Sequence, residues 1–204
     1  MEVPTIDLSN PKSTLFDQIS QACSTLGFFE ITSHSIPTPL LTSIQTQSKQ
    51  FFNLPTPTKQ SLKRTTNNSR GYFNDEYTKQ KLDWKECLDI GMPGGRDWEV
   101  DNGECLEGCN QFPEDGELRK VVIEYFKACE CLANEIAGYM STGLLHQSND
   151  GGDDIVERLK EEHTSFLRLN HYPPYDNNEN NEVLGISPHH DAGKSITISY
   201  VITI

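Results

Sequence analysis

The chain has 204 residues, of which 23% are charged, and its formal net charge at pH 7 is -13. This length is enough for one large domain or two small ones with a sizeable hydrophobic core. The acidic balance argues against nucleic acid and against an anionic membrane surface as partners.

The sequence also argues against membrane insertion and secretion. It contains no run of 18 apolar residues, so no membrane-spanning helix is expected. The first residues lack the basic segment and the apolar stretch of a secretory signal peptide. The six cysteines form no CxxC pair and show no paired zinc-finger spacing. We therefore expect a cytoplasmic protein with reduced thiols.

Short strands and helices are expected to alternate near the N-terminus. Residues 3–8 predict an entry strand. Asn10 is expected to cap a helix that has Pro11 at its first position and ends at Gly27. Residues 28–32 are rich in β-forming residues and predict a second strand.

Two further helices are expected next. Thr38 and Pro39 open the first, and a further helical turn over residues 58–63 follows the break at Pro55 and Pro57. Helical spacing predicts an apolar inner face for the first of these helices, made of Leu40, Leu41, Ile44, Phe51 and Phe52.

Residues 64–112 show little periodicity, whereas the segment that follows has a clear helical pattern. Residues 64–112 are rich in glycine and polar side chains, and a short strand is expected only within residues 84–90. From Pro113 to residue 144, apolar residues recur with a period of about 3.6, which predicts the longest helix and a buried spine. Alternation over residues 165–172 predicts a strand that ends before Pro173.

The remaining elements are a short helix at 155–162, a loop at 177–182, and strands at 183–187 and 195–204. Helices thus come first and strands late in the chain. This order indicates the α+β class.

His189 and Asp191 are the most informative pair for function. They lie two positions apart, so in an extended strand both side chains project from the same face. An imidazole and a carboxylate supply two of the three ligands of the facial triad found in non-haem Fe(II) oxygenases. Alone, this tripeptide favours a satisfied polar pair in an unrelated acidic α+β domain, because H-x-D is common by chance.

The pair belongs to a series of motifs along the chain. The N-terminal part contains VPTIDLS, LGFFEITSHSIP and FFNLPTPTKQ, residues 168–173 read R-L-N-H-Y-P, and residues 189–193 read H-H-D-A-G. In order and spacing these motifs resemble those of plant-type 2-oxoglutarate- and Fe(II)-dependent dioxygenases. The resemblance covers roughly residues 3–193.

The resemblance implies a fold and a division into domains. Residues 1–112 would form the non-haem dioxygenase N-terminal domain, and residues 113–204 the spine helix with the first part of the Fe(II)/2-oxoglutarate domain. The architecture would be a helical N-terminal region packed on an incomplete jelly-roll (double-stranded β-helix) core.

The resemblance also implies cofactors and site residues. His189 and Asp191 match iron ligands, and Asn170 and Tyr172 match positions at the 2-oxoglutarate site. Arg168 matches the motif arginine, for which we expect a structural role. The implied reaction oxidises a small organic metabolite with oxygen and 2-oxoglutarate, with ascorbate as reductant.

Two features of that family are not found within the 204 residues. Neither its second metal-binding His nor its Arg-x-Ser follows Asp191, and residues 194–204 read KSITISYVITI where the family runs x-L-T-x-L-x-Q-D. We therefore expect a family member cut short and inactive as this chain. An alternative is a non-catalytic fragment that acts as an interaction or interfering protein.

The other histidines are poor candidates for substitute ligands. His171 is expected to face away from Asn170 and Tyr172, and His190 away from His189, because adjacent strand residues alternate. Surface or packing roles are expected for all of the histidines other than His189, namely His34, His146, His163, His171 and His190.

Overall fold

The computed structural model describes residues 2–78, 81–92, 108–114, 116–145, 165–174 and 185. The chain divides into two compact units. Unit 1 comprises Met1–Thr38, Lys127–His163 and Ile196–Ile204, and unit 2 comprises Pro39–Phe126 and Thr164–Ser195. Helices and sheets are both present, as the α+β class predicts.

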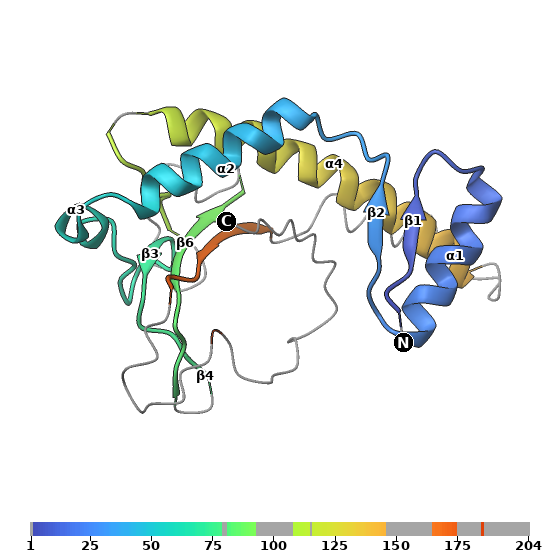
Figure 1. Ribbon diagram of the computed structural model, residues 1–204, viewed down its shortest axis with the longest axis horizontal. Helices are drawn as coiled ribbons and strands as arrows, with labels where there is room; N and C mark the ends of the chain where they lie inside the picture. Colours follow the sequence, from blue (N-terminus) through green and yellow to red (C-terminus); the bar gives the residue numbers. More distant parts are fainter. Residues whose placement is uncertain are drawn as a thin grey trace. The chain divides into compact units, whose positions relative to one another are not determined.

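Unit 1 contains a two-stranded parallel sheet and the helix that connects its strands. Strand β1 (Thr5–Asp7) pairs with β2 (Glu30–Thr32), and α1 (Lys12–Thr25) lies beside them (Figure 1). Parallel strands need such a crossover connection, usually a helix. Three residues of α1 are buried, at the helical spacing expected from the sequence: Leu15, Ile19 and Ala22.

The start of α1 differs from the expectation. Asn10 was expected as the N-cap, but Pro11 holds that position with φ -55° and ψ 143°. Asn10 is instead part of a turn, because its backbone N–H donates to the Asp7 carbonyl at 3.1 Å. The Asp7 carboxylate accepts from both the N–H and the hydroxyl of Ser9, and the Ser9 backbone N–H is the main cause of its lowered pKa. This turn moves the helix start by one residue.

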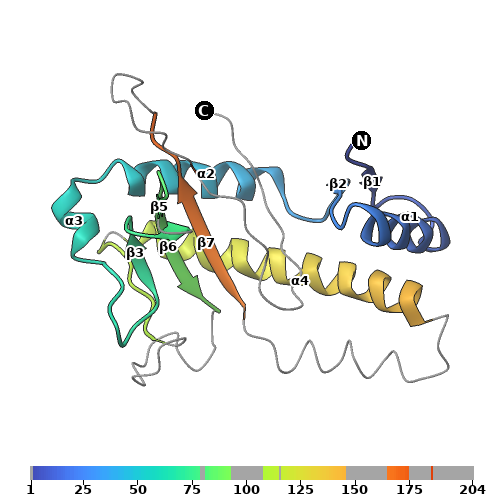
Figure 2. The ribbon, with the colours of Figure 1, turned by 90° about the horizontal axis from the view of Figure 1, so that it is seen from below.

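Unit 2 is built on a three-stranded antiparallel sheet in the order β3-β6-β7. The strands are β3 (Gly71–Phe73), β6 (Glu86–Gly91) and β7 (Phe166–His171), and Figure 2 shows β6 and β7 side by side. A small hairpin, β4 (Tyr77–Thr78) with β5 (Lys81–Leu82), joins β3 to β6. Strands β6 and β7 confirm the two strands expected in this region.

Helices α2 (Thr38–Phe52) and α3 (Thr56–Gln60) belong to the same unit, apart from Thr38. The expected inner face of α2 is confirmed for Leu41, Ile44, Phe51 and Phe52, which are buried, whereas Leu40 is only partly buried. Helix α3 begins two residues before the expected range, because Pro55 takes the N-cap position with φ -53° and ψ 140°.

One face of the sheet packs against α2. The Phe51 ring meets Tyr72 at a centroid distance of 6.3 Å, and the Phe52 ring stacks on His171 at 5.2 Å. Leu88, directly opposite Leu169 in the register, is fully buried. His171 therefore points to the apolar side, away from Asn170, and the packing role expected for it is confirmed.

The long helix expected from residue 113 is confirmed as α4 (Glu117–Leu145). It begins after Gly116, whose φ of +74° is incompatible with a helix. Its buried residues in unit 2 are Leu118, Val122, Tyr125 and Phe126. Those in unit 1 are Leu132, Ile136, Ala137 and Tyr139. In the described part of the chain, no helix combines the length and apolar character needed to cross a membrane.

Several expected elements fall outside the described residues. They are the helix at 155–162, the loop at 177–182 and the strands at 183–187 and 195–204. The same holds for the residues of the H-x-D motif and for His146, His163 and His190.

Candidate functional site

The face of the sheet turned away from α2 carries polar side chains. Because residues alternate along paired strands, Cys87 and Asp89 of β6 project from the same face as Asn170 and Arg168 of β7. The register places Cys87 opposite Asn170 and Asp89 opposite Arg168. We call these four residues the polar sheet face.

Arg168 and Asp89 form a two-pronged ion pair across the strands. The guanidinium Nε lies 2.7 Å from Asp89 Oδ1, and Nη2 lies 2.8 Å from Oδ2. Burial disfavours the guanidinium charge, but the hydrogen bond and the charge of Asp89, with a further contribution from Glu76, outweigh burial and raise the pKa of Arg168. This fork-to-fork geometry supports the structural role expected for Arg168.

A second ion-pair layer adjoins the first. Glu76 lies 2.6 Å from the Lys85 ammonium and 3.4 Å from Arg168, and Lys85 also reaches Asp83 at 3.2 Å. Burial alone would raise the pKa of Glu76, but the hydrogen bond from Lys85 and the charge of Arg168 lower it overall. Lys85 and Arg168 are thus both engaged by carboxylates.

Asn170 is held by a thiol. Cys87 Sγ donates to Asn170 Oδ1 across a distance of 3.2 Å, and Cys87 is fully buried. Burial is the largest influence on this thiol and raises its pKa to about 12. The thiol is therefore protonated at neutral pH and acts as the hydrogen-bond donor. Within the described residues, the Nδ2 group of Asn170 donates to no partner.

Tyr172 follows directly after β7 and is 51% exposed. The next residue is anchored, because Trp84 Nε1 donates to the Pro173 carbonyl at 2.9 Å. A Cβ added to Gly185 would lie 3.1 Å from two atoms of the Tyr172 ring. Glycine at position 185 therefore leaves room for the ring, and residues 172 and 185 are neighbours in space.

Of the four expected site residues, Asn170 and Tyr172 lie at the end of β7, and His189 and Asp191 are outside the described residues. Among the residues that the structure describes, no group of three or more His, Cys, Asp or Glu side chains is placed to hold a metal ion.

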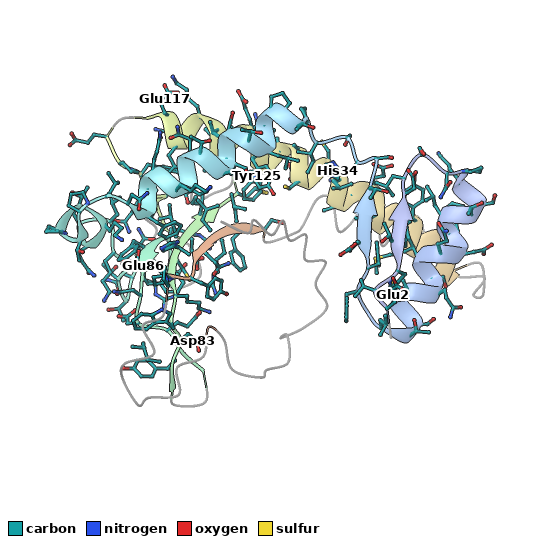
Figure 3. All side chains as sticks on the ribbon, in the orientation of Figure 1. Glu2, His34, Asp83, Glu86, Glu117 and Tyr125 are labelled. Atoms are coloured by element: carbon teal, nitrogen blue, oxygen red, sulfur yellow. The ribbon has the colours of Figure 1, made fainter. Side chains whose placement is uncertain are left out.

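Sequence reasoning missed the partners of the R-L-N motif. These partners lie in residues 64–112, where the sequence shows little periodicity. Cys87, Asp89 and Glu76 contact the motif, and Lys85 supports it through Glu76. Figure 3 shows Glu86 and Asp83 among the side chains around this sheet. The alternation of Cys87 and Asp89 within an expected strand was a usable signal for a shared face, but it could not reveal the partner strand.

Comparison with known proteins gives the family. Residues 3–115 match the family described as "non-haem dioxygenase in morphine synthesis N-terminal". The 2-oxoglutarate-Fe(II) type oxidoreductase hxnY of Emericella nidulans is 30% identical over 89% of this chain and 54% of its own length. Gibberellin 20 oxidase 1 of Arabidopsis thaliana is 32% identical over 97% of this chain and 52% of its own length. The chain thus spans about half the length of these curated relatives.

Solved structures agree at the level of the fold. The crystal structure of JOX2 in complex with 2OG, Fe and JA is 24% identical and has a TM-score of 0.66, covering 85% of this chain and 48% of that one. A putative 2OG-Fe(II) oxygenase family protein from Caulobacter crescentus is 18% identical with a TM-score of 0.69, covering 85% and 57%. The match over residues 3–115 takes in more than half of the 204 residues, so the chain belongs to the 2-oxoglutarate/Fe(II)-dependent non-haem dioxygenase family.

Proposed function

We propose that this chain supplies part of a 2-oxoglutarate- and Fe(II)-dependent dioxygenase that oxidises a small organic metabolite. Asn170 and Tyr172 would contact 2-oxoglutarate, and His189 and Asp191 would bind Fe(II). The sheet β3-β6-β7 would belong to a jelly-roll core. The division into domains after residue 112 and a cytoplasmic location stay predictions.

The observation that carries this proposal is the arrangement at the end of β7. The Asn170 amide is fixed through its oxygen, and its Nδ2 group has no acceptor within the described residues. Tyr172, two residues further on, is half exposed and offers a phenolic O–H. Two hydrogen-bond donors next to one another suit an anionic ligand such as a dicarboxylate.

The local charge limits what these residues can do alone. Arg168 is engaged by Asp89, and Lys85 by Glu76 and Asp83, so neither cation is left to face a dicarboxylate. The 204 residues contain no Arg-x-Ser sequence. We therefore propose that Asn170 and Tyr172 orient 2-oxoglutarate through neutral hydrogen bonds, which are weaker than charge-assisted ones.

The donor set also fits iron. An imidazole nitrogen and a carboxylate oxygen are the ligand types of non-haem Fe(II) sites, and bound Fe(II) with 2-oxoglutarate would supply the oxidising power for attack on a C–H bond. Gly185, beside the Tyr172 ring, is four residues before His189.

The substrate is proposed only as a class. The matched relatives carry names such as gibberellin 20 oxidase, flavonoid 7-O-demethylase and homoarginine-6-hydroxylase. Each of these names refers to a small organic molecule, and the molecules belong to different chemical classes. A small organic metabolite is the description common to them.

Binding experiments test the cofactor assignment without requiring turnover. Isothermal titration calorimetry with Mn(II), a redox-stable substitute for Fe(II), should show metal-dependent binding of 2-oxoglutarate. Asp191→Ala should abolish the metal dependence, and Asn170→Ala should weaken 2-oxoglutarate binding about 3- to 10-fold, the range expected for one hydrogen bond. Lys120→Ala, a change at an exposed ion pair on α4, is the matched control and should bind as the unaltered chain does.

Equal 2-oxoglutarate affinity in the unaltered chain and in Asp191→Ala would overturn the proposed function. Turnover is a separate question, tested by succinate release with Fe(II), 2-oxoglutarate, ascorbate and a panel of small metabolites. We expect no succinate from the 204-residue polypeptide, because His189 and Asp191 match only two of the three ligands of the facial triad. Succinate release that is lost in Asp191→Ala would contradict that expectation and support the family activity.

A further inference from the structure

The contact between Cys87 and Asn170 joins the proposed cofactor site on β7 to the neighbouring strand β6. The two residues are directly opposite in the register of β6 and β7 and 83 positions apart in the chain. The thiol lies below the sheet surface with no exposed area, while Asn170 is exposed. A buried donor therefore holds an exposed amide from beneath.

The chemistry of the two groups gives this contact a direction. The acceptor oxygen and the donor NH₂ group of a carboxamide exchange places when the group rotates by half a turn. Its orientation therefore depends on its hydrogen-bond partners. A protonated thiol offers one hydrogen, and the pKa of Cys87, raised by burial to about 12, keeps that hydrogen in place at neutral pH. With Oδ1 of Asn170 accepting from Sγ, the NH₂ group must point away from Cys87.

The side chains next to this pair do not replace Cys87 as hydrogen-bond donor to Asn170. Asp89, two residues from Cys87 on the same face, is occupied by the fork of Arg168. Arg168, two residues from Asn170, is turned toward Asp89 and Glu76. Among the described residues, Cys87 is the side chain that donates to the Asn170 oxygen.

We propose that Cys87 is a positioning residue for 2-oxoglutarate, because its thiol fixes the Asn170 amide with the NH₂ group presented to the bound carboxylate. This inference rests on the proposed function. Without the thiol, the amide can rotate by half a turn and present its oxygen to an anion. A carboxylate would then meet an acceptor in place of a donor, and binding would weaken.

Two substitutions separate positioning from packing. Cys87→Ser keeps an O–H donor at the same place, whereas Cys87→Ala removes the donor and also shortens the side chain. Both lower the stability of the buried site, since one buries a hydroxyl and the other leaves a small cavity. Only positioning predicts that the two variants differ in their affinity for 2-oxoglutarate.

The main measurement is the Kd of 2-oxoglutarate in the presence of Mn(II), below the unfolding temperature of each variant. Cys87→Ala should raise Kd about 3- to 10-fold, the effect of one lost hydrogen bond, and Cys87→Ser should stay within about twofold of the unaltered chain. Equal Kd changes in the two variants would overturn the inference, because they would reflect packing alone.

Infrared spectroscopy provides a readout independent of the ligand. The S–H stretching band of Cys87 is isolated as the difference between the unaltered chain and Cys87→Ser, since the other five cysteines cancel. The same difference taken with Asn170→Ala in both proteins should show the band shifted to higher frequency, as expected for a thiol that has lost its acceptor. An unshifted band would overturn the inference.

The outcomes distinguish this inference from the proposed function. If Asn170→Ala leaves the Kd of 2-oxoglutarate unchanged, the proposed cofactor site is wrong and the inference is overturned with it. If Asn170→Ala weakens binding and Cys87→Ala does not, only the positioning role of Cys87 is overturned. Weakening in both, with recovery in Cys87→Ser, supports it.

Discussion

Asp89 on β6 and Arg168 on β7 lie directly opposite one another and are joined by two hydrogen bonds of 2.7 and 2.8 Å. The Asp89 side chain is 7% exposed and that of Arg168 is 30% exposed. This ion pair connects segments 79 residues apart and lies next to the pair formed by Cys87 and Asn170.

Replacing Asp89 should therefore destabilise the sheet. Asp89→Asn removes the charge that the Arg168 guanidinium faces while keeping the size of the side chain. We expect a loss of about 2 kcal/mol in the free energy of unfolding, because the guanidinium then faces a neutral amide and keeps the longer ion pair with Glu76 at 3.4 Å. Urea unfolding followed by circular dichroism measures this loss.

An exposed ion pair provides the control for Asp89→Asn. Lys120 and Glu117 are 70% and 58% exposed, and Glu117→Gln should change the free energy of unfolding by less than about 0.5 kcal/mol. Equal effects at the two sites would show that the Asp89–Arg168 pair contributes no more than a surface ion pair.

Glu76 should make stability depend on pH in the acidic range. Its folded-state pKa lies below the ordinary value of 4.5, because the hydrogen bond from Lys85 and the charge of Arg168 outweigh the effect of burial. The folded state therefore binds fewer protons than the unfolded state. The stabilisation is fully present above pH 4.5 and is lost as the pH falls below it through the folded-state pKa.

Urea unfolding at pH 6 and at pH 3 checks this dependence, with Glu76→Gln as the comparison. The substitution should lower stability at pH 6 and reduce the difference between the two pH values. Asp75 has a lowered pKa as well, mainly through its hydrogen bond with Lys63, so part of the dependence should persist. Identical pH profiles for the two proteins would contradict the role of Glu76.

Gly138 in α4 should be replaceable with a gain in stability. It lies inside a helix of 29 residues, and a Cβ added there would meet no heavy atom within 4 Å. Gly138→Ala should raise the free energy of unfolding by about 0.5–1 kcal/mol, because alanine loses less backbone entropy in a helix. The adjacent Ala137→Gly should lower it, both through the backbone entropy of glycine and through the loss of a buried methyl group. A loss of stability in Gly138→Ala would refute this expectation.

Gly185→Ala should affect cofactor binding more than stability. The new Cβ would lie 3.1 Å from the Tyr172 ring, which is 51% exposed and can therefore move. Moving the ring off its preferred rotamer costs about 0.5–1.5 kcal/mol, so 2-oxoglutarate should bind about 2- to 10-fold more weakly. Calorimetry with Mn(II) measures the affinity.

Gly138→Ala is the control for Gly185→Ala as well. It should leave the affinity for 2-oxoglutarate unchanged, since it lies on α4 and not beside Tyr172. If Gly185→Ala binds 2-oxoglutarate as the unaltered chain does, the Tyr172 ring does not take part in binding.

The sequence was most informative where structure depends on local periodicity. Apolar residues at helical spacing predicted α1, α2 and α4, and alternation before Pro173 predicted β7. It was less reliable at boundaries, where the Asp7 turn moved the start of α1 and Pro55 moved that of α3. It missed β3, β4 and β5, which have only three, two and two residues and lie in a segment rich in glycine and polar side chains.

The sequence by itself determined the family, the long helix and the faces of β7, because these follow from motifs and from spacing along a continuous segment. Only the tertiary structure decided which residues support the motif. Cys87 meets Asn170 across 83 residues, and Asp89 meets Arg168 across 79, through the pairing of β6 with β7. Such a register is chosen by the packing of both faces of the sheet at once, which no local pattern contains.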